Sequence, residues 1–494
     1  MHPPRRCSPT KLVGFVCLLA ASTTGCGNDC VGVGCQDDFA AALLNVVDGS
    51  ETDSRTIMSP LESWAEVRGA LDEGPNWDVL PSVGALVAGG PGTGRVQSFS
   101  LSEGDNHRSA DRDGSILGDQ PADGFGSRLA RGQDLDGDGS SELVVSAPNW
   151  DRERSTRQNG GVFIFNQLSN GFSGNLDAGG QADWIFAGEE NGAQFGDAVA
   201  ACPDLDGDGR GELLIGAPRS DRGAHLAGAV YLAPGARLER GRQVRSDTLK
   251  YRWTGAAIGE MAGYDVSCSH DLLGDGLAEL IVGAPFADGD HEAEGAIYVL
   301  DGATPPAAGD LSTAARHTLR GAQTNGWLGW AVATGDIDGD GLPELVGGAP
   351  GTLRSDSNSV ARRGAGAALL WDGADLRGGR SPLHRIRLNG EQDGDSFGRS
   401  VTITDLDDDG YADLLVGAPR RTPDPDRAET FEAGALYLFR GAAGYLGWRP
   451  SMDAEDADLI WEEERQFLRT GQRVRAGDLT GDGRLDLILV NRSD

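Results

Sequence analysis

The chain has 494 residues, of which 75 are glycine and only 6% are aromatic. Asp and Glu number 76 against 43 Lys and Arg, which gives a formal net charge of −33 at pH 7. This acidity excludes nucleic acid as a partner, because nucleic-acid-binding proteins use a basic face to displace counterions from the phosphates. Abundant glycine with few aromatic residues favours many short strands joined by tight turns.

Residues 1–25 are predicted to be an export signal. Two arginines and Lys11 form a positive region, and the apolar stretch Leu12–Ala21 that follows is too short to span a bilayer. The residues Ala-Ser-Thr-Thr-Gly-Cys that end at Cys26 resemble a bacterial lipoprotein signal, although Thr23 stands where that pattern usually has Leu. The resemblance implies that Cys26 is lipidated, and ordinary secretion with cleavage nearby is the alternative.

Membrane attachment is therefore expected only through this N-terminal lipid, because no second apolar stretch approaches the ~20 residues of a spanning helix. The protein is expected to be exported to the cell envelope, at the outer surface or in the periplasm, or else to be secreted. Residues 26–61 are small, polar and acidic and predict a flexible tether. Within it, Phe39–Val47 predicts a short strand or helix, and Cys30 and Cys35 are spaced for a small disulfide.

Residues 62–494 contain an internal repeat. Each copy holds a Phe-Gly or a variant of it, then Asp-x-Asp-x-Asp-Gly-x-x-Glu/Asp, then a short apolar run that ends in Gly-Ala-Pro in most copies. Repetition at intervals of 65 to 73 residues indicates one supersecondary unit per repeat. The acidic loops start at Asp134, Asp204, Asp271, Asp336, Asp405 and Asp478.

Each repeat predicts four strands. In the second repeat, the apolar run Glu212–Pro218 after the acidic loop is a buried strand, and a second strand begins at Gly228. A third apolar stretch, Tyr251–Gly255, precedes the Phe-Gly element of the following repeat. The Phe-Gly segment leads a fourth strand, as in Phe195–Ala201. Four strands in about 67 residues, repeated radially, make the blade of a β-propeller.

Together the Phe-Gly, the Asp-rich loop and the Gly-Ala-Pro resemble the FG-GAP repeat of the integrin α-subunit headpiece, also found in many bacterial surface proteins. The match covers residues 125–491, and a worn upstream copy at Ser82–Pro91 and Gly94–Leu101 keeps its strands but not the acidic loop. The resemblance implies an all-β, seven-bladed propeller in a bacterial exported or lipoprotein form. A six-bladed ring is the alternative, in which the upstream copy merges with the final one.

The last repeat stops after the first of the two strands that follow its acidic loop. An N-terminal strand, within Phe39–Val47 or around Trp64, is therefore expected to complete this blade and to remove its open edge.

The acidic loops predict calcium sites. Oxygen donors occupy positions 1, 3 and 5, glycine occupies position 6 and a carboxylate returns at position 9. Alternating Asp side chains can curl around one Ca²⁺, which takes six to eight oxygen ligands. An EF-hand is excluded because its twelfth position, here Val145, lies inside a predicted strand. Mg²⁺ is disfavoured because it retains several waters, and plain acidic turns are the alternative to a metal site.

Up to six Ca²⁺ ions are predicted, with the residue at position 7 contributing its backbone carbonyl. The third and sixth sites are expected to be weakest, because Leu273 and Thr480 replace the second Asp. The predicted ligands are Asp134, Asp136, Asp138, Ser140, Glu142, Asp204, Asp206, Asp208, Arg210, Glu212, Asp271, Asp275, Leu277, Glu279, Asp336, Asp338, Asp340, Leu342, Glu344, Asp405, Asp407, Asp409, Tyr411, Asp413, Asp478, Thr480, Asp482, Arg484 and Asp486.

Three further residues lie close to these loops. Cys202 and Cys268 precede the second and third loops, and they are predicted to be either a disulfide or two buried thiols. His270 adjoins the third loop, but it is interpreted as a loop or packing residue because hard calcium prefers oxygen.

The predicted function is that of an exported, calcium-stabilised propeller acting as a cell-surface binding or adhesion module for a protein or glycan partner. An enzyme is not expected, because the chain contains neither Gly-x-Ser-x-Gly nor His-Glu-x-x-His. The alternatives are a hydrolase-like enzyme with a site in the propeller channel and a purely structural envelope protein.

Overall fold

The computed structural model describes residues 6–7, 54–58, 64–68, 78–82, 85–90, 94–100, 112–151, 158–166, 168–236, 242–268, 270–355, 361–362, 364–379, 383–425, 430–462, 467, 469–477 and 485–490. Most of the predicted export signal lies outside the described residues. So do Cys26, Cys30, Cys35 and Phe39–Val47, together with residues 478–484 of the sixth acidic loop.

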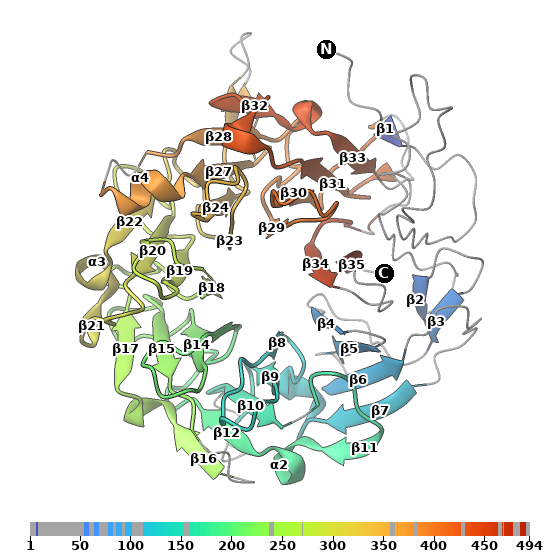
Figure 1. The fold of residues 1–494 in the computed structure, drawn as a ribbon, viewed down its shortest axis with the longest axis vertical. Helices are drawn as coiled ribbons and strands as arrows, with labels where there is room; N and C mark the ends of the chain where they lie inside the picture. Colours follow the sequence, from blue (N-terminus) through green and yellow to red (C-terminus); the bar gives the residue numbers. More distant parts are fainter. Residues whose placement is uncertain are drawn as a thin grey trace.

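Short sheets, antiparallel except at their outermost strands, stand radially around a central axis (Figure 1). From the axis outward, the first three sheets contain β4 (Asp78–Ser82), β5 (Ala85–Gly90), β6 (Arg95–Ser100), β7 (Arg112–Leu117) and β11 (Gly174–Asp177); β8 (Leu129–Arg131), β9 (Leu143–Ala147), β10 (Gly161–Phe165), β12 (Trp184–Ala187) and β16 (Arg242–Arg245); β13 (Ala198–Cys202), β14 (Glu212–Ala217), β15 (Ala229–Ala233), β17 (Tyr251–Thr254) and β21 (Gly309–Asp310).

The next three sheets follow the same plan. They contain β18 (Asp265–Ser267), β19 (Leu280–Ala284), β20 (Ala296–Leu300) and β22 (His317–Arg320); β23 (Ala331–Gly335), β24 (Glu344–Ala349), β27 (Ala367–Trp371), β28 (Ile386–Asn389) and β32 (Ser451–Asp453); β29 (Ser400–Thr404), β30 (Asp413–Ala418), β31 (Ala435–Phe439), β33 (Leu459–Glu462) and β1 (Arg6–Cys7).

The remaining described strands form pairs. They are β2 (Ser54–Met58) with β3 (Trp64–Arg68), β25 (Arg354–Ser355) with β26 (Ala361–Arg362), and β34 (Arg473–Gly477) with β35 (Asp486–Val490). The described helices are short and lie in the connections: α2 (Ala178–Gln181), α3 (Leu311–Ala314), α4 (Gly373–Arg377), η2 (Pro121–Asp123), η3 (Ser246–Thr248), η5 (Ala443–Tyr445) and η6 (Ala454–Asp456). None of the described helices is long and apolar enough to cross a membrane.

The inner strands close the ring. Along the described part of the chain, seven inner strands contact one another in the order β4, β8, β13, β18, β23, β29 and β34, and β34 returns to β4. Figure 1 shows the hairpin β2–β3 outward of β34–β35 on the same radius. The strand predicted around Trp64 is β3, and β2 lies within the segment predicted as a tether. Among the described residues β3 pairs with β2 and not with β35, so the completion of the last blade by this strand stays a prediction. The all-β propeller fold is confirmed.

Neighbouring sheets are also joined at their outer edges. Strand β11, which precedes β12 in the chain, pairs in parallel with β7 of the preceding sheet. Strands β16, β21 and β32 pair in the same way with the preceding sheets. In these four cases the connection before an outer strand reaches back to the previous blade, an arrangement that the sequence pattern did not predict.

The Phe-Gly and Gly-Ala-Pro motifs pack blade against blade. A Cβ added to Gly348, in the Gly-Ala-Pro of one blade, would lie 2.0 Å from the carbonyl oxygen of Gly398, in the Phe-Gly of the next. The corresponding distance from Gly216 to Gly263 is 2.1 Å. Two backbones approach this closely only where no side chain intervenes. The ring of Phe397 packs edge-on against Tyr437 of its own blade, with the ring centroids 5.2 Å apart.

One disulfide crosses between blades. Cys202 at the end of β13 is bonded to Cys268, which follows β18, and their Cα atoms are 5.0 Å apart. Of the two arrangements predicted for these cysteines, the disulfide is the one that forms. It links two inner strands just before they enter the second and third acidic loops.

Candidate metal centres

The five described acidic loops lie at one end of the inner strands, because each joins the inner strand of a sheet to the second strand. In five of them, carboxylate oxygens gather within 4.8 Å of one another. The clusters are Asp134, Asp136, Asp138 and Glu142; Asp204, Asp206, Asp208 and Glu212; Asp271, Asp275 and Glu279; Asp336, Asp338 and Glu344; Asp405, Asp407 and Asp413. Of the sixth predicted site, Asp478, Thr480, Asp482 and Arg484 lie outside the described residues.

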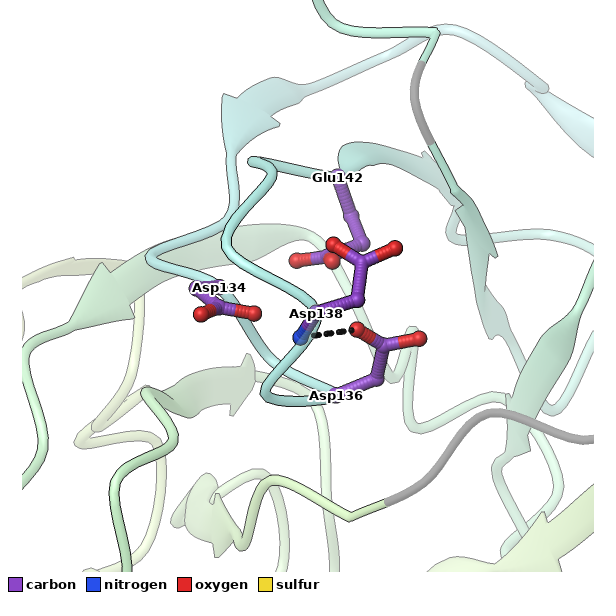
Figure 2. A group of neighbouring side chains, drawn as sticks. All are labelled: Asp134, Asp136, Asp138 and Glu142. Carbon is purple, nitrogen blue, oxygen red and sulfur yellow. Dashed lines mark hydrogen bonds between the residues drawn. The ribbon is translucent and has the colours of Figure 1, made fainter.

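The first loop is folded around the carboxylate of its first residue, and Figure 2 shows its four acidic side chains around one turn. The Oδ1 of Asp134 accepts a hydrogen bond from the amide of Gly137 at 2.8 Å, and its Oδ2 accepts one from Gly139 at 3.0 Å. Gly139 has φ +87°, which only glycine adopts without strain, so the predicted sharp turn at position 6 is present. Asp136 accepts from the amide of Asp138 at 3.0 Å.

The carboxylate at position 9 is the most buried member of each cluster. The Oε2 of Glu142 accepts from the amide of Leu135 at 2.8 Å, whereas its Oε1 is buried without any protein partner. Glu212 and Glu279 show the same half-satisfied arrangement. A buried carboxylate oxygen without a partner carries a large desolvation cost unless a cation lies beside it.

The same burial perturbs the titration of these acids. Desolvation, together with the negative charges of Asp136 and Asp134, raises the pKa of Glu142 to about 7. Desolvation and the nearby aspartates likewise raise the pKa of Glu212 to about 7 and that of Glu279 to about 8. A cation among these carboxylates would oppose both effects and lower these pKa values, because it favours the ionised form. The all-oxygen donor set and the unpartnered oxygens fit a hard divalent cation such as Ca²⁺.

In the fourth and fifth loops, the carboxylate at position 9 has different hydrogen-bond partners. The side chain of Tyr445 hydrogen-bonds Glu344, whose pKa desolvation raises to about 8. In the fifth loop the Oδ1 of Asp413 accepts from the amide of Gly441 at 3.0 Å, and desolvation raises the pKa of Asp413 to about 7. The acids at position 5, Asp340 and Asp409, lie outside these two clusters, whereas the position-5 acids of the first three loops lie inside theirs.

The third loop has fewer carboxylates, as expected from Leu273. Only Asp271, Asp275 and Glu279 are gathered there. Neighbouring His270 contacts Thr334, with its Nδ1 2.8 Å from the hydroxyl oxygen, and the histidine is not a member of the cluster. Desolvation lowers the pKa of His270, which favours its neutral form.

The side chain at position 7 has a role that the sequence reading missed. Arg210 of the second loop reaches back to the first, where its Nε donates to the carbonyl of Asp136 at 3.1 Å. The ring of Tyr411 lies 2.3 Å from where a Cβ on Gly339 of the preceding loop would be. For position 7 the sequence predicts only a backbone carbonyl ligand, and that role remains a prediction at Ser140, Arg210, Leu277, Leu342 and Tyr411.

A contact from another strand connection was also missed. Asn166, just after β10, donates through Nδ2 to Asp136 at 3.3 Å and to Asp138 at 3.1 Å. No motif marks this residue, because its proximity to the loop depends on the pairing of β10 with β9.

Comparison with known proteins matches the FG-GAP repeat model five times, at residues 125–165, 195–232, 263–300, 328–370 and 397–439. The chain is 27% identical to Integrin alpha-5 of Xenopus laevis over 229 residues, which cover 46% of this chain and 19% of that protein. It is 38% identical to Integrin alpha-IIb of Mus musculus over 168 residues, 34% of this chain and 14% of that protein.

A relative of another kind is Phosphatidylinositol-glycan-specific phospholipase D of Homo sapiens. The identity is 30% over 171 residues, which cover 33% of this chain and 18% of that protein. In all three comparisons the matched segment spans less than a fifth of the relative's length.

Proposed function

The chain is a β-propeller of FG-GAP repeats, similar to integrin α subunits, and we propose that it is an exported binding module held rigid by calcium. The acidic loops at one end of the inner strands bind up to six Ca²⁺ ions, of which the third and sixth are the weakest. Loops at the opposite end bind a protein or glycan partner at the cell surface. The N-terminus leads the chain through export, and Cys26 carries the lipid that anchors it.

The observation that supports calcium is the unpartnered, buried oxygen of Glu142, Glu212 and Glu279. When bound, Ca²⁺ would supply the positive charge that these carboxylates otherwise lack. The aspartates at positions 1, 3 and 5 complete the donor set, while the amides that donate to Asp134 hold the loop in its turn. Since the loop links the two strands nearest the axis, fixing it stabilises the blade by mass action.

The proposed inequality of the sites can be tested with substitutions at position 3. In calorimetric titrations of the calcium-free full chain, Leu273→Asp should convert the weakest of the five described sites into one that fills with the others. The converse change, Asp206→Leu, should add a second weak site. Equal filling of all sites in the unaltered chain would contradict the ranking.

Binding is tested by cell-surface capture. The labelled full chain, incubated with cells of its own kind in calcium, should bind saturably and be displaced by the unlabelled chain. A calcium-loaded chain that remains folded by circular dichroism but binds no cell surface would overturn the adhesion proposal. In intact cells, Cys26→Ser should release the protein from the membrane fraction without altering its fold.

Hydrolysis is the second candidate function, and the phospholipase D relative favours it. The chain contains neither Gly-x-Ser-x-Gly nor His-Glu-x-x-His, so no nucleophile motif supports it. Incubation of the full chain with phosphatidylinositol-glycan anchors should leave them intact, and release of product by the purified chain would make this candidate the leading one.

A further inference from the structure

The end of the inner strands opposite the acidic loops carries a pocket of about 310 Å³, which is lined by residues of three consecutive blades. Its walls include Trp327 and Trp330, which precede β23, and Arg399, which precedes β29. Pro350 and Pro419, the last residues of two Gly-Ala-Pro motifs, form part of the same lining. The repeat motifs thus build the frame of the pocket, while residues that differ between repeats line it.

The aromatic wall is a packed group. The rings of Trp327 and Trp330 have centroids 5.8 Å apart, and Tyr264 lies behind Trp330 at 4.6 Å. The guanidinium of Arg399 stacks over the Trp330 ring at 4.2 Å and is hydrogen-bonded to Tyr264. Arg399 is therefore held in one orientation before any ligand arrives, so that little side-chain entropy remains to be lost on binding.

The opposite wall is basic. Arg420 and Arg469 both donate to the buried carboxylate of Glu432, at 3.0 Å to its Oε1 and 2.6 Å to its Oε2. The side chain of Arg420 is 57% exposed and that of Arg469 is 30% exposed, so both still face solvent. Among the described residues that line the pocket, three are arginines and none is a carboxylate. Even with Glu432 counted, the group has a formal charge of +2 in a chain whose net charge is −33.

The aromatic and basic residues of the pocket occur in only some of the repeats. The residue after each Phe-Gly or its variant is Ser127, Asp197, Tyr264, Trp330, Arg399 or Gln472. Aromatic and basic residues occupy this position only in three consecutive repeats. The other repeats place small, amide or acidic side chains there, so packing of the motif does not by itself require an aromatic or basic residue.

We propose that this pocket binds a carboxylate-bearing sugar at the end of an acidic glycan. Because Arg399 covers the face of Trp330, the indole of Trp327 is the ring that can pack against the apolar face of a pyranose, and arginine forks bind a carboxylate in a bidentate manner. The volume is at the lower end of small-molecule sites and is much larger than the single acidic side chain of a peptide requires. The inference rests on the proposed binding function and names the ligand class at that end of the propeller.

The test uses two sugars that share the same backbone and differ only at C6, where one has a carboxylate and the other a hydroxymethyl group. Calorimetric titration of the full chain in calcium compares β-1,4-linked tetraglucuronate with the neutral cellotetraose. We expect the tetraglucuronate to bind at least tenfold more tightly, which corresponds to about 1.4 kcal/mol for the charge-assisted contacts. Trp330→Ala and Arg420→Gln should each weaken tetraglucuronate binding at least tenfold. Arg420 is exposed and Arg469 still pairs with Glu432, so Arg420→Gln should remain folded, and the unfolding midpoint checks this directly.

Arg245→Gln is the matched control, because Arg245 is a half-exposed arginine that is also paired with acids, on a distant blade. Equal affinity for the two tetrasaccharides, no binding of either, or unchanged affinity in both pocket variants would overturn the proposal. Binding of a hexaglutamate peptide in place of tetraglucuronate would overturn it in favour of an acidic peptide. A chain that still captures cell surfaces in calcium but binds no tetraglucuronate would refute this inference alone and leave the proposed function standing.

Discussion

The two ends of the inner strands differ in which residues recur from blade to blade. At one end, acidic loops recur with nearly the same carboxylates in five described blades. At the other end, the glycines of the motifs recur, but the adjoining side chains change from Asp197 to Trp330 to Arg399. Residues that every blade needs for folding are repeated, whereas residues that meet one ligand need to occur only once. The contrast supports the proposal that the acidic end serves stability and the opposite end serves recognition.

The largest loss of stability at the acidic end is expected from removing the disulfide between Cys202 and Cys268, which are 66 positions apart. Replacing both by Ala should lower the free energy of unfolding by about 4 kcal/mol, through the entropy of the unfolded chain. Denaturant unfolding measures this loss, and the affinity for tetraglucuronate should not change. An unaltered midpoint would show that the disulfide adds nothing to the ring closure.

At the opposite end, Gly348→Ala tests the backbone contact between blades. The added methyl would lie 2.0 Å from the carbonyl oxygen of Gly398, so one blade must shift, at a cost of about 3 kcal/mol. Gly309→Ala is the control, because there the nearest atom is 4.0 Å away. If both variants unfold at the same denaturant concentration, close packing does not explain the repeated glycine.

A smaller effect on stability, whose direction differs between calcium and chelator, is expected from Glu142→Gln. In calcium, the loss of one ligand should lower the calcium affinity of this site about tenfold. The free energy of unfolding should then fall by about 1.4 kcal/mol. In chelator at pH 8, the variant should be no less stable than the parent, because it removes a buried carboxylate whose pKa is raised to about 7. Glu292→Gln, an exposed position away from the acidic loops, should be silent in both conditions. Equal destabilisation in calcium and in chelator would mean that Glu142 serves only the protein fold.

The smallest effect is that of pH on the calcium response. Glu142 and Glu212 have pKa values of about 7 in the folded chain and an ordinary value of 4.5, so between these values the folded state binds more protons than the unfolded state. The stability of the calcium-free chain therefore falls as pH rises through this window, whereas calcium binding, which displaces these protons, strengthens. The rise in Tm caused by calcium should be larger at pH 8 than at pH 6. A pH-independent rise would contradict carboxylate ligation at these sites.

The sequence predicted most of the blade interior. The strand expected within Glu212–Pro218 is β14, and every residue of it is buried, as a continuous apolar run implies. The clustering of Asp134, Asp136, Asp138 and Glu142 also followed from their spacing alone. Both features depend on residues close together in the chain, where periodicity and turn chemistry are informative.

What the sequence did not predict depends on distant residues. Strand β11 is mostly exposed and has no apolar alternation, and it becomes a strand only because β7 offers an open edge. The pocket brings together Trp330, Arg399 and Arg469, each about 70 residues from the next, and only the packing of consecutive blades makes them neighbours. The exclusion of Asp340 from the fourth cluster likewise cannot be read from its motif, which is identical in spacing to the first.

The central claim, that the acidic end is a set of calcium sites on which the ring depends, is tested most directly by thermal unfolding of the full chain. Tm is measured in calcium, then in excess chelator, then with magnesium or calcium restored to the chelated sample. The account predicts a large fall in Tm with chelator that calcium reverses and magnesium does not. An unchanged Tm would contradict it and would leave the acidic loops as turns in a propeller that needs no metal.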